Sequence, residues 1–255
     1  MSLRLSPIVQ GPEEAETLVF LQGWPDDATL WEPQVAALSD RYRCVRTTMP
    51  NFDGRRTARW GHDTDEIVAA LAQMIGEVCP GKKVTLIAHD WGCYWAYRLF
   101  AERRDLIGGF AALDIAPHVE AGPLAILGVL AYQGWLITAF LLGGPIGDWM
   151  TRTLARALGA PMPLAQIHSG MNYPYRNAWR DLPRGRGMPQ TKGDWPQGPV
   201  LFVYGKRKPF PFHSPEWIDY VEGGGGSVFG LDCGHWVSTD PAFEGILETW
   251  LGRPL

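Results

Sequence analysis

The stretch Leu86–Tyr97, LIAHDWGCYWAY, places a carboxylate where a buried strand is expected to turn into a helix. Residues 84–88 are a short apolar run and Gly92 opens a helical pattern, so Asp90 falls at a strand-to-helix corner. Such a corner is the geometry of a nucleophile elbow, where Ser is the usual occupant and one side chain is pushed into a pocket beside a helix N-terminus. The pattern A-x-D-x-G predicts a nucleophilic Asp90. The alternative is that Asp90 only caps the helix that begins near Trp91.

A nucleophilic carboxylate needs a base that activates water for the second step, and His235 is the best placed of the six histidines. It follows the last predicted strand, in GLDCGHWVSTD, and precedes a terminal helix. An acid should orient its imidazole, but the basic segment 206–208 occupies the place after the later strand where such an acid commonly stands. Asp114 ends an earlier predicted strand, and a buried acid there needs a partner such as His235. We expect Asp114 to be the orienting acid, with Asp232 as the alternative.

A site of this kind also needs backbone N–H donors for a developing oxyanion. Gly23 and Trp24 stand immediately after the early predicted strand, in LVFLQGWPDD, which suits a sharp bend that presents the Trp24 amide. The Trp91 amide, next to Asp90, is expected to be the second donor.

The elements that must position these residues alternate along the chain. Apolar runs rich in β-branched residues predict strands, and amphipathic patterns between most of them predict helices. The strands are expected at 18–21, 44–47, 84–88, 110–115, 200–204 and 227–231, and the helices at 30–38, 65–78, 93–102, 215–221 and 241–251. This alternation indicates a mainly parallel sheet covered on both faces.

The alternation fails between about Pro117 and Pro199, a region with no convincing strand. We interpret it as a helical insertion at the carboxyl ends of the strands, where α/β sheets place their ligand sites. The expected organisation is a core domain at 1–116 and 199–255 with a cap at 117–198.

Composition narrows the classes of function. A net charge of −4 and scattered Lys and Arg give no basic footprint for nucleic acid. The four cysteines have no metal-binding or disulfide spacing, and the N-terminus has no apolar core of signal-peptide length, so we expect a cytoplasmic protein with reduced thiols. No metal site is predicted.

One stretch argues against solubility. Residues 121–147 carry no formal charge and are about long enough to span a bilayer. Two prolines, two glycine breaks and several polar residues interrupt the stretch, which also lies inside an α/β pattern. We therefore expect a buried or pocket-lining helix pair there, with no membrane as a partner.

Together these residues resemble the α/β-hydrolase superfamily, and within it the branch with an aspartate nucleophile: epoxide hydrolases and haloalkane or haloacid dehalogenases. The H-D-W-G elbow at His89–Gly92 is characteristic of this branch, and Gln22–Pro25 is similar to its H-G-x-P oxyanion motif with Gln in place of His. The resemblance covers nearly the whole chain and implies an α/β-hydrolase fold, a mostly parallel doubly wound sheet with a helical cap inserted after strand 6. It implies that Asp90, Asp114 and His235 form a catalytic triad. An acid at the position of Asp114 resembles several dehalogenases, whereas most epoxide hydrolases carry it after the following strand.

The cap separates the two activities, because epoxide hydrolases use two cap tyrosines to protonate the epoxide oxygen. Tyr132 in LAYQGW is similar to the first of these, and Tyr175 in YPYRNAW to the second, with Tyr173 as a rival for the second role. The alternative is that all three only pack in an aromatic cap. Fluoroacetate-type dehalogenases carry arginines beside the nucleophile, but this chain has aromatic residues there, which disfavours a carboxylate substrate.

The resemblance therefore implies a cofactor-free hydrolase acting on a small apolar, uncharged substrate and water, most of all an epoxide. The first alternative is hydrolysis of a carbon–halogen bond, with Trp91 and either a second indole or the tyrosines holding the halide. The second is a non-hydrolytic ligand-binding protein of the same fold, suggested by the basic segment 206–208 and by Gln22, since the missing His normally braces the oxyanion loop. A homodimer is left open.

Overall fold

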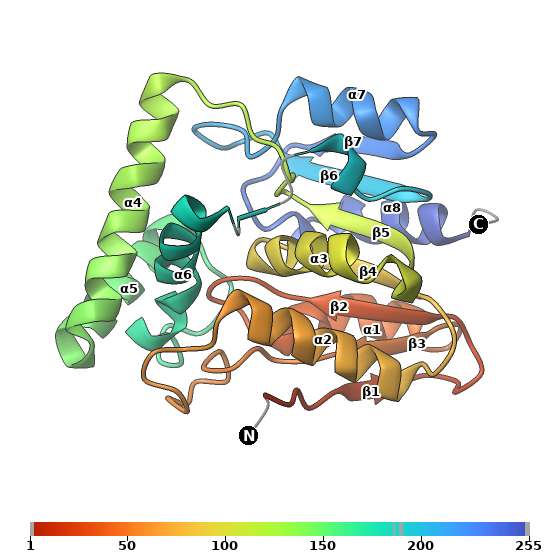
Figure 1. Ribbon diagram of the computed structural model, residues 1–255, viewed down its shortest axis with the longest axis horizontal. Coiled ribbons are helices and arrows are strands. Elements are labelled where there is room, and N and C mark those ends of the chain that lie inside the picture. Colours follow the sequence, from red (N-terminus) through yellow and green to blue (C-terminus); the bar gives the residue numbers. More distant parts are fainter. Residues whose placement is uncertain (1–2, 186, 189–190, 253–255) are drawn as a thin grey trace.

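The computed structural model of the chain describes residues 3–185, 187–188 and 191–252. In this part of the chain a seven-stranded sheet has the order β1-β3-β2-β4-β5-β6-β7 (Figure 1). The strands are β1 (Ile8–Gln10), β2 (Thr17–Leu21), β3 (Arg43–Arg46), β4 (Val84–His89), β5 (Ile107–Leu113), β6 (Val200–Gly205) and β7 (Ser227–Leu231). Every neighbouring pair is parallel except β1 with β3, which is antiparallel.

The predicted mostly parallel sheet is confirmed, and all six expected strands are present with ends shifted by at most a few residues. β1 was not predicted. It has three residues, IVQ, lies at the sheet edge and is exposed along its whole length, so it is too short for a sequence pattern to reveal.

Helices cover both faces of the sheet, as expected for a doubly wound fold. One face packs against α2 (Thr64–Val78), α3 (Trp91–Glu102) and α7 (Pro215–Gly223), and the other against α1 (Glu32–Leu38) and α8 (Pro241–Leu251). The two buried apolar clusters on either side of the sheet follow this division. β2 and β4 at the centre are buried at every position, which explains their continuous apolar sequences.

The chain leaves the sheet after β5 and returns to it at β6. Between them lie α4 (Pro123–Leu142), α5 (Gly144–Leu158), α6 (Tyr173–Asp181) and short 3-10 turns, with no strand among the described residues of this segment. Figure 1 shows these helices gathered at one end of the sheet. The insertion follows the fifth strand of this sheet in chain order, whereas the expectation named a sixth, following the family's strand count.

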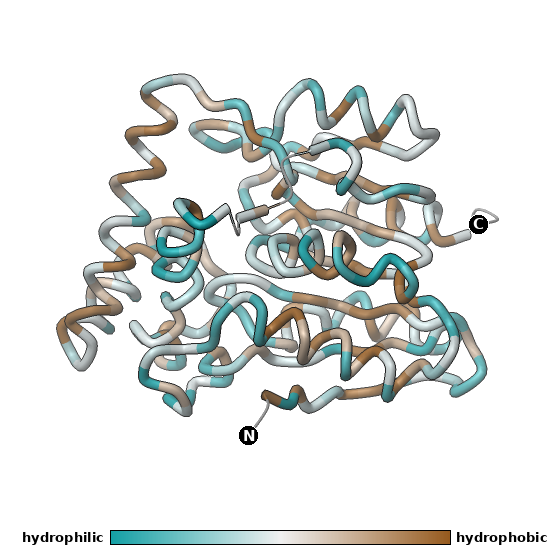
Figure 2. The backbone as a smooth tube through the Cα atoms, in the orientation of Figure 1, coloured by the Kyte–Doolittle hydropathy of each residue, from teal (hydrophilic) through white to brown (hydrophobic). Residues whose placement is uncertain are grey.

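Residues 121–147 were expected to form a buried or pocket-lining helix pair; the structure has a helix pair there, with Tyr132 near Asp90, but the expected burial was wrong. Of the α4 residues only Leu136, Ala139 and Phe140 are buried, while Leu124 is 85% exposed. Figure 2 shows apolar residues along most of this helix at the edge of the molecule. Apolar composition cannot reveal how many neighbours a helix has, and the main helices beside α4 in the cap are α5 and α6.

Asp26 is buried where the loop after β2 meets the segment after β7. Asp26, three residues beyond the Gly23 turn, is 2% exposed, and its Oδ2 accepts a 2.7 Å hydrogen bond from the indole N–H of Trp236. Burial raises the pKa of this carboxyl to about 7, the Trp236 bond opposes that shift, and the charge of Asp90 adds to it. Asp26 therefore holds a proton in the folded state at pH values where the unfolded chain has lost it.

This shift predicts that the folded state loses stability as the pH rises. A carboxyl whose pKa is raised by folding stabilises the fold fully below its unfolded pKa of 3.8, and that contribution disappears as the pH passes about 7. Asp26→Asn removes the titration and keeps an oxygen for Trp236. Between pH 4 and pH 8, urea unfolding should show the wild type losing about 3 kcal/mol relative to this variant. Asp27→Asn, a partly exposed neighbour, is the control, and an unchanged difference across this range would contradict the assignment.

Candidate active site

The corner between β4 and α3 has the backbone of an elbow. Asp90 adopts φ 53° and ψ −122°, a left-handed conformation that costs a non-glycine residue of order 1–3 kcal/mol. Its side chain makes no hydrogen bond to the helix that follows, so it is not a helix cap. The alternative interpretation of Asp90 as a cap is therefore excluded by its geometry.

Two glycines let the elbow touch the end of β2. A Cβ on Gly92 would lie 2.2 Å from the carbonyl oxygen of Leu21, and a Cβ on Gly23 would lie 2.3 Å from the Cβ of Asp90. Neither position can carry a side chain without moving the backbone. This contact brings the loop after β2 directly against the carboxylate.

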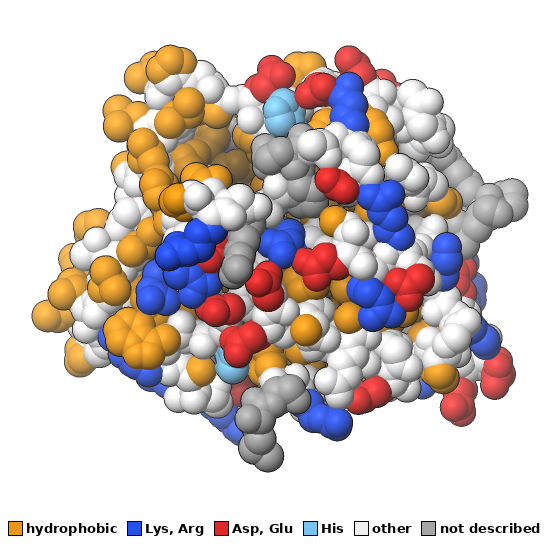
Figure 3. All heavy atoms as spheres, viewed as in Figure 1, with side chains coloured by type: hydrophobic (Ala, Val, Ile, Leu, Met, Phe, Trp, Pro, Cys, Tyr) orange, Lys and Arg blue, Asp and Glu red, His pale blue; other side chains and the backbone are white. Residues whose placement is uncertain are grey.

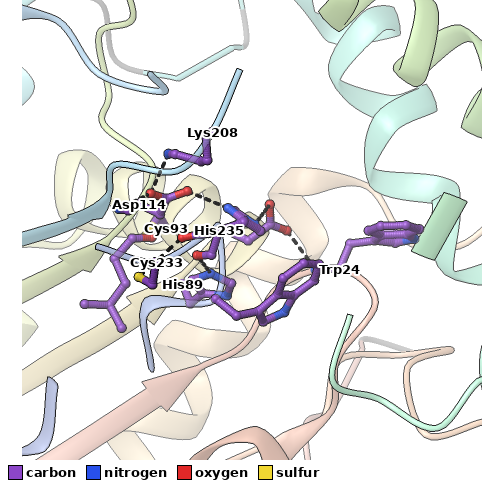
Figure 4. A network of polar contacts seen from close by, with 12 residues as sticks. Trp24, His89, Cys93, Asp114, Lys208, Cys233 and His235 are labelled. Carbon is purple, nitrogen blue, oxygen red and sulfur yellow. Dashed lines mark hydrogen bonds and ion pairs between the residues drawn. The ribbon is translucent and has the colours of Figure 1, made fainter. Parts of the chain in front are cut away.

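Asp90, His235 and Asp114 lie together, although they come from three separate loops. Figure 4 shows Asp114 between His235 and Lys208. His235 Nε2 is 3.2 Å from Asp90 Oδ2, and His235 Nδ1 is 2.5 Å from Asp114 Oδ2. The imidazole thus connects the two carboxylates through its two nitrogens, one on each side. The three predicted residues are thus in hydrogen-bonding contact, a geometry that suits the predicted roles of nucleophile, base and orienting acid.

Burial and charge act against each other in this trio. Burial alone would raise the pKa values of both acids, but the hydrogen bond and charge of His235 outweigh it, and the pKa of Asp90 is lowered while that of Asp114 falls to about 2. For His235, burial lowers the pKa, but its bonds to Asp114 and Asp90 raise it to about 9. At neutral pH the trio therefore holds two carboxylates around an imidazolium.

Lys208 completes the charge balance. Its Nζ lies 2.5 Å from Asp114 Oδ1, and its side chain is only 7% exposed. Asp114 Oδ1 also accepts the backbone N–H of Gly205 at 2.9 Å. Lys208 belongs to the basic segment that stands where an acid was expected, so this segment supplies a cation to Asp114 instead of an acid to His235.

The Trp24 amide faces the Asp90 carboxylate. It donates a 2.7 Å hydrogen bond to Asp90 Oδ1, and the Trp24 indole donates to Asn172 Oδ1 at 2.8 Å. Asn172 lies in the cap, where its own amide group donates to Leu136 and Thr151. The predicted oxyanion donor is thus held on one side by the core and on the other by the cap. The Trp91 amide lies at the first position of α3, where helix geometry leaves backbone N–H groups unused.

Gln22 occupies the position of the family's histidine and is fully buried. With its amide turned to suit its neighbours, the nitrogen donates to the Thr47 carbonyl at 2.8 Å and the oxygen accepts from the Met49 N–H at 3.0 Å. Gln22 therefore braces the loop after β2 against the segment after β3. It does not reach Asp90 with a hydrogen bond.

Two of the three cap tyrosines approach Asp90. The rings of Tyr132, from α4, and Tyr175, from α6, meet edge to face with centroids 6.1 Å apart. Burial raises the pKa of both hydroxyls, to about 12 for Tyr132, and the charge of Asp90 raises both further. Tyr175 also packs against Trp91 and Trp24. Both phenols therefore remain protonated beside the carboxylate.

Tyr173 and Asp232 are not part of this group. The ring of Tyr173 lies against Phe52 and Gly61, and its hydroxyl has no hydrogen-bond partner among the described residues. Asp232 forms an ion pair with Arg207 at 3.3 Å, and its side chain is 84% exposed. Neither alternative assignment has support from the geometry.

Three residues of the site were not predicted: Lys208, Asn172 and His89 as a neighbour of the base. His89 Nε2 lies 3.0 Å from the His235 carbonyl oxygen, and the two rings are 4.5 Å apart. Burial and the charge of His235 lower the pKa of His89 to about 4, so His89 stays neutral beside the imidazolium. Its place in H-D-W-G was visible in the sequence, but its contact with His235 was not.

Within the described residues, no group of three or more His, Cys, Asp and Glu side chains is arranged to hold a metal ion.

Comparison with known proteins agrees with this fold. The family model described as "Alpha/beta hydrolase family" matches residues 18–244. The crystal structure of the Bacillus megaterium epoxide hydrolase is similar with a TM-score of 0.72 and 17% sequence identity, covering 98% of this chain and 97% of that one. A second structure, described under "Novel epoxide hydrolases belonging to the alpha/beta hydrolases superfamily in metagenomes from hot environments", has a TM-score of 0.67 at 20% identity and covers 98% and 95%.

Among curated proteins, the chain is 27% identical over 178 residues to "Probable oxidoreductase EphD" of Mycobacterium tuberculosis, which is 65% of this chain and 26% of that protein. It is 24% identical over 145 residues to "Soluble epoxide hydrolase" of Corynebacterium sp., 54% of this chain and 47% of that one. The alignments span between about a quarter and half of these relatives. Because the family model matches most of the sequence, the chain belongs to the alpha/beta hydrolase family.

Proposed function

We propose that this chain is a cofactor-free hydrolase that opens epoxides of apolar, uncharged substrates through an ester on Asp90. The observation that carries the proposal is that the two oxygens of this carboxylate have different partners. Its Oδ1 accepts the Trp24 N–H, and its Oδ2 faces His235 Nε2. Relatives named epoxide hydrolase support the substrate class.

In the first step a carboxylate oxygen of Asp90 attacks an epoxide carbon. A carbon–oxygen ester bond forms while the carbon–oxygen bond of the ring breaks, and the departing alkoxide takes a proton from Tyr132 or Tyr175. The raised pKa values of these phenols match a donor that must stay protonated until an alkoxide appears. An imidazolium at His235 then returns the proton to the phenol through solvent.

Ester formation prepares His235 for the second step. The ester removes the charge of Asp90, one of the two carboxylates that raise the pKa of His235 to about 9. Lys208 meanwhile balances Asp114, so the remaining carboxylate holds the proton on His235 less strongly. The neutral ring takes a proton from water, which attacks the ester carbonyl while the Trp24 and Trp91 amides stabilise the oxyanion. When this intermediate collapses, the bond between the Asp90 carbonyl carbon and the substrate oxygen breaks, and that oxygen takes the proton of the newly formed carboxyl group, which releases the diol and restores the Asp90 carboxylate.

Carbon–halogen hydrolysis is the second candidate, favoured by the position of Asp114 at the end of β5. It needs free donors for the departing halide. The Trp24 indole N–H already donates to Asn172, and the Trp91 ring packs edge to face against Tyr175, with centroids 4.9 Å apart. A pair of phenols beside a carboxylate is better suited to a leaving alkoxide, and so we favour the epoxide.

The remaining alternative, a binding protein without activity, rested on Gln22 and the basic segment. Gln22 makes two hydrogen bonds that brace the loop, and Lys208 is engaged with Asp114. Both features are therefore compatible with a working site.

The direct test is to trap the ester. His235→Gln should block hydrolysis, so that mass spectrometry of protein quenched after mixing with an apolar epoxide such as styrene oxide finds the substrate mass on the peptide that contains Asp90. Asp90→Ala should show no adduct and lose about 10⁴-fold or more in turnover. The wild type should release diol from epoxides and no halide from 1-chlorobutane. Halide release without diol, or an adduct on another residue, would refute the proposal.

The tyrosines supply a matched comparison. Tyr132→Phe and Tyr175→Phe should each slow ester formation about 10-fold to 100-fold, because each removes one donor to the leaving oxygen. Tyr173→Phe is the control, since it removes a buried hydroxyl without a partner among the described residues. Stopped-flow tryptophan fluorescence measures the step, and an equal loss in all three variants would indicate that these rings only pack.

Lys208→Met should affect the second step and spare the first. Without the cation, Asp114 holds the proton on His235 more strongly, so the pH profile of ester hydrolysis should move to higher pH, with hydrolysis at pH 7 slowed about 10-fold. Lys208→Arg keeps the charge and should restore the profile. Single-turnover kinetics separates the steps, and an equal slowing of ester formation and hydrolysis would show that Lys208 only supports the fold.

A further inference from the structure

The outer face of the cap combines exposed apolar side chains with basic residues. On α4, Leu124, Leu127, Trp135 and Leu142 fall at helical spacing on one face, whereas Tyr132, Leu136 and Ala139 fall on a different face, about a quarter of a turn away, toward the site. The outer face continues onto α5. We call this surface the cap strip; its main members are Leu124 (85% exposed), Leu127 (63%), Leu142 (59%), Ile146 (63%) and Trp149 (61%).

Figure 3 shows the orange side chains of this region along the edge of the molecule, with blue side chains gathered next to them. Among the described residues, α4 is the one helix long and apolar enough to cross a membrane, with 17% of its most apolar window buried. It does not need to cross one, because its inner face is already engaged. Tyr132 lies beside Asp90, and Asn172 binds the carbonyl of Leu136.

Basic groups border one end of the strip. Arg59 donates to the carbonyl oxygens of Phe140 and Leu141 in the last turn of α4, and its guanidinium lies 4.4 Å from the centroid of the exposed Trp60 ring. Arg56 and Arg59 line a hollow of about 440 Å³ together with the Gly143–Pro145 turn; Asp148, which pairs with Arg56, is the acid in its wall. Arginine and tryptophan beside exposed leucines are the residues that peripheral proteins place at a lipid interface.

The charge of the chain is distributed in the same sense. Residues 117–198 contain seven Lys and Arg and four Asp and Glu, a net charge of +3. Because the whole chain has a net charge of −4, the remaining residues have a net charge of −7. An acidic core with a basic, apolar cap would approach an anionic surface with the cap first. A two-fold dimer through the strip would instead bring two such caps against each other.

We propose that the cap strip docks on the surface of an anionic lipid bilayer, with α4 lying in the plane of the headgroups. The leucines and Ile146 enter the acyl boundary, Trp149 and Trp60 lie at headgroup depth, and Arg59 contacts lipid phosphates. The occupant is a bilayer surface, and the catalytic groups take no part in this contact. The proposal replaces the expectation of no membrane partner, which assumed that residues 121–147 were covered.

The test is cosedimentation of the purified chain with large unilamellar vesicles. The wild type should bind vesicles of phosphatidylcholine with equimolar phosphatidylglycerol, bind phosphatidylcholine alone at least 10-fold more weakly, and be released by high salt. Leu127→Glu combined with Leu142→Glu should weaken binding at least 10-fold. Ile8→Glu, on the exposed edge strand β1, is the matched control and should bind like the wild type.

Folding and function are checked separately. Thermal melting and diol formation from a soluble epoxide should be the same in all three proteins. If none of them hydrolyses the epoxide, the proposed function fails, but the vesicle binding still tests the membrane proposal. Light scattering measures the molar mass in solution and so tests the alternative that a second copy of the chain binds the cap strip. The proposal is overturned if the wild type does not bind anionic vesicles. This holds whether the wild type is monomeric or is a dimer that the double variant dissociates. It is also overturned if the double variant binds as well as the wild type.

Discussion

The contact between Gly23 and Asp90 is the constraint on which the site depends. It places the Trp24 amide 2.7 Å from the carboxylate and is permitted only because positions 23 and 92 lack a Cβ. The strained backbone of Asp90 is held by parallel strands on both sides of β4, which are buried and cannot relax. The energy stored at one corner is thus supported by the central part of the sheet.

The second organising feature is an alternation of charge: carboxylate, imidazolium, carboxylate and ammonium, from Asp90 through His235 and Asp114 to Lys208. Each ion lies next to at least one ion of opposite sign, which makes burial of four ionisable groups tolerable. In this chain the acid stands at the end of β5, and the segment after β6 supplies a cation to it. The position of an acid and the identity of the residue that replaces it are therefore linked.

Much of this could be predicted from local patterns. Buried strands have continuous apolar sequences, and the elbow is a local motif, so the sheet and the corner at Asp90 were visible in the sequence. Asp114 could be inferred because a buried acid at a strand end requires a partner. Lys208, Asn172 and the exposure of α4 could not, because each depends on which distant segments become neighbours. The same holds for the burial of Asp26, because Trp236, which donates to it, is 210 positions away in the sequence.

The two hydrogen bonds of Trp24 have a mechanical consequence. Its amide is fixed to the elbow and its indole to Asn172, so one residue spans the seam between the two halves of the molecule. A rigid-body movement of the cap would displace Trp24 and disturb its hydrogen bond to Asp90 Oδ1. If Trp24 stays in place, substrate must enter through the motion of individual side chains or loops around it. Otherwise each opening must break and remake the hydrogen bond between Trp24 and Asn172.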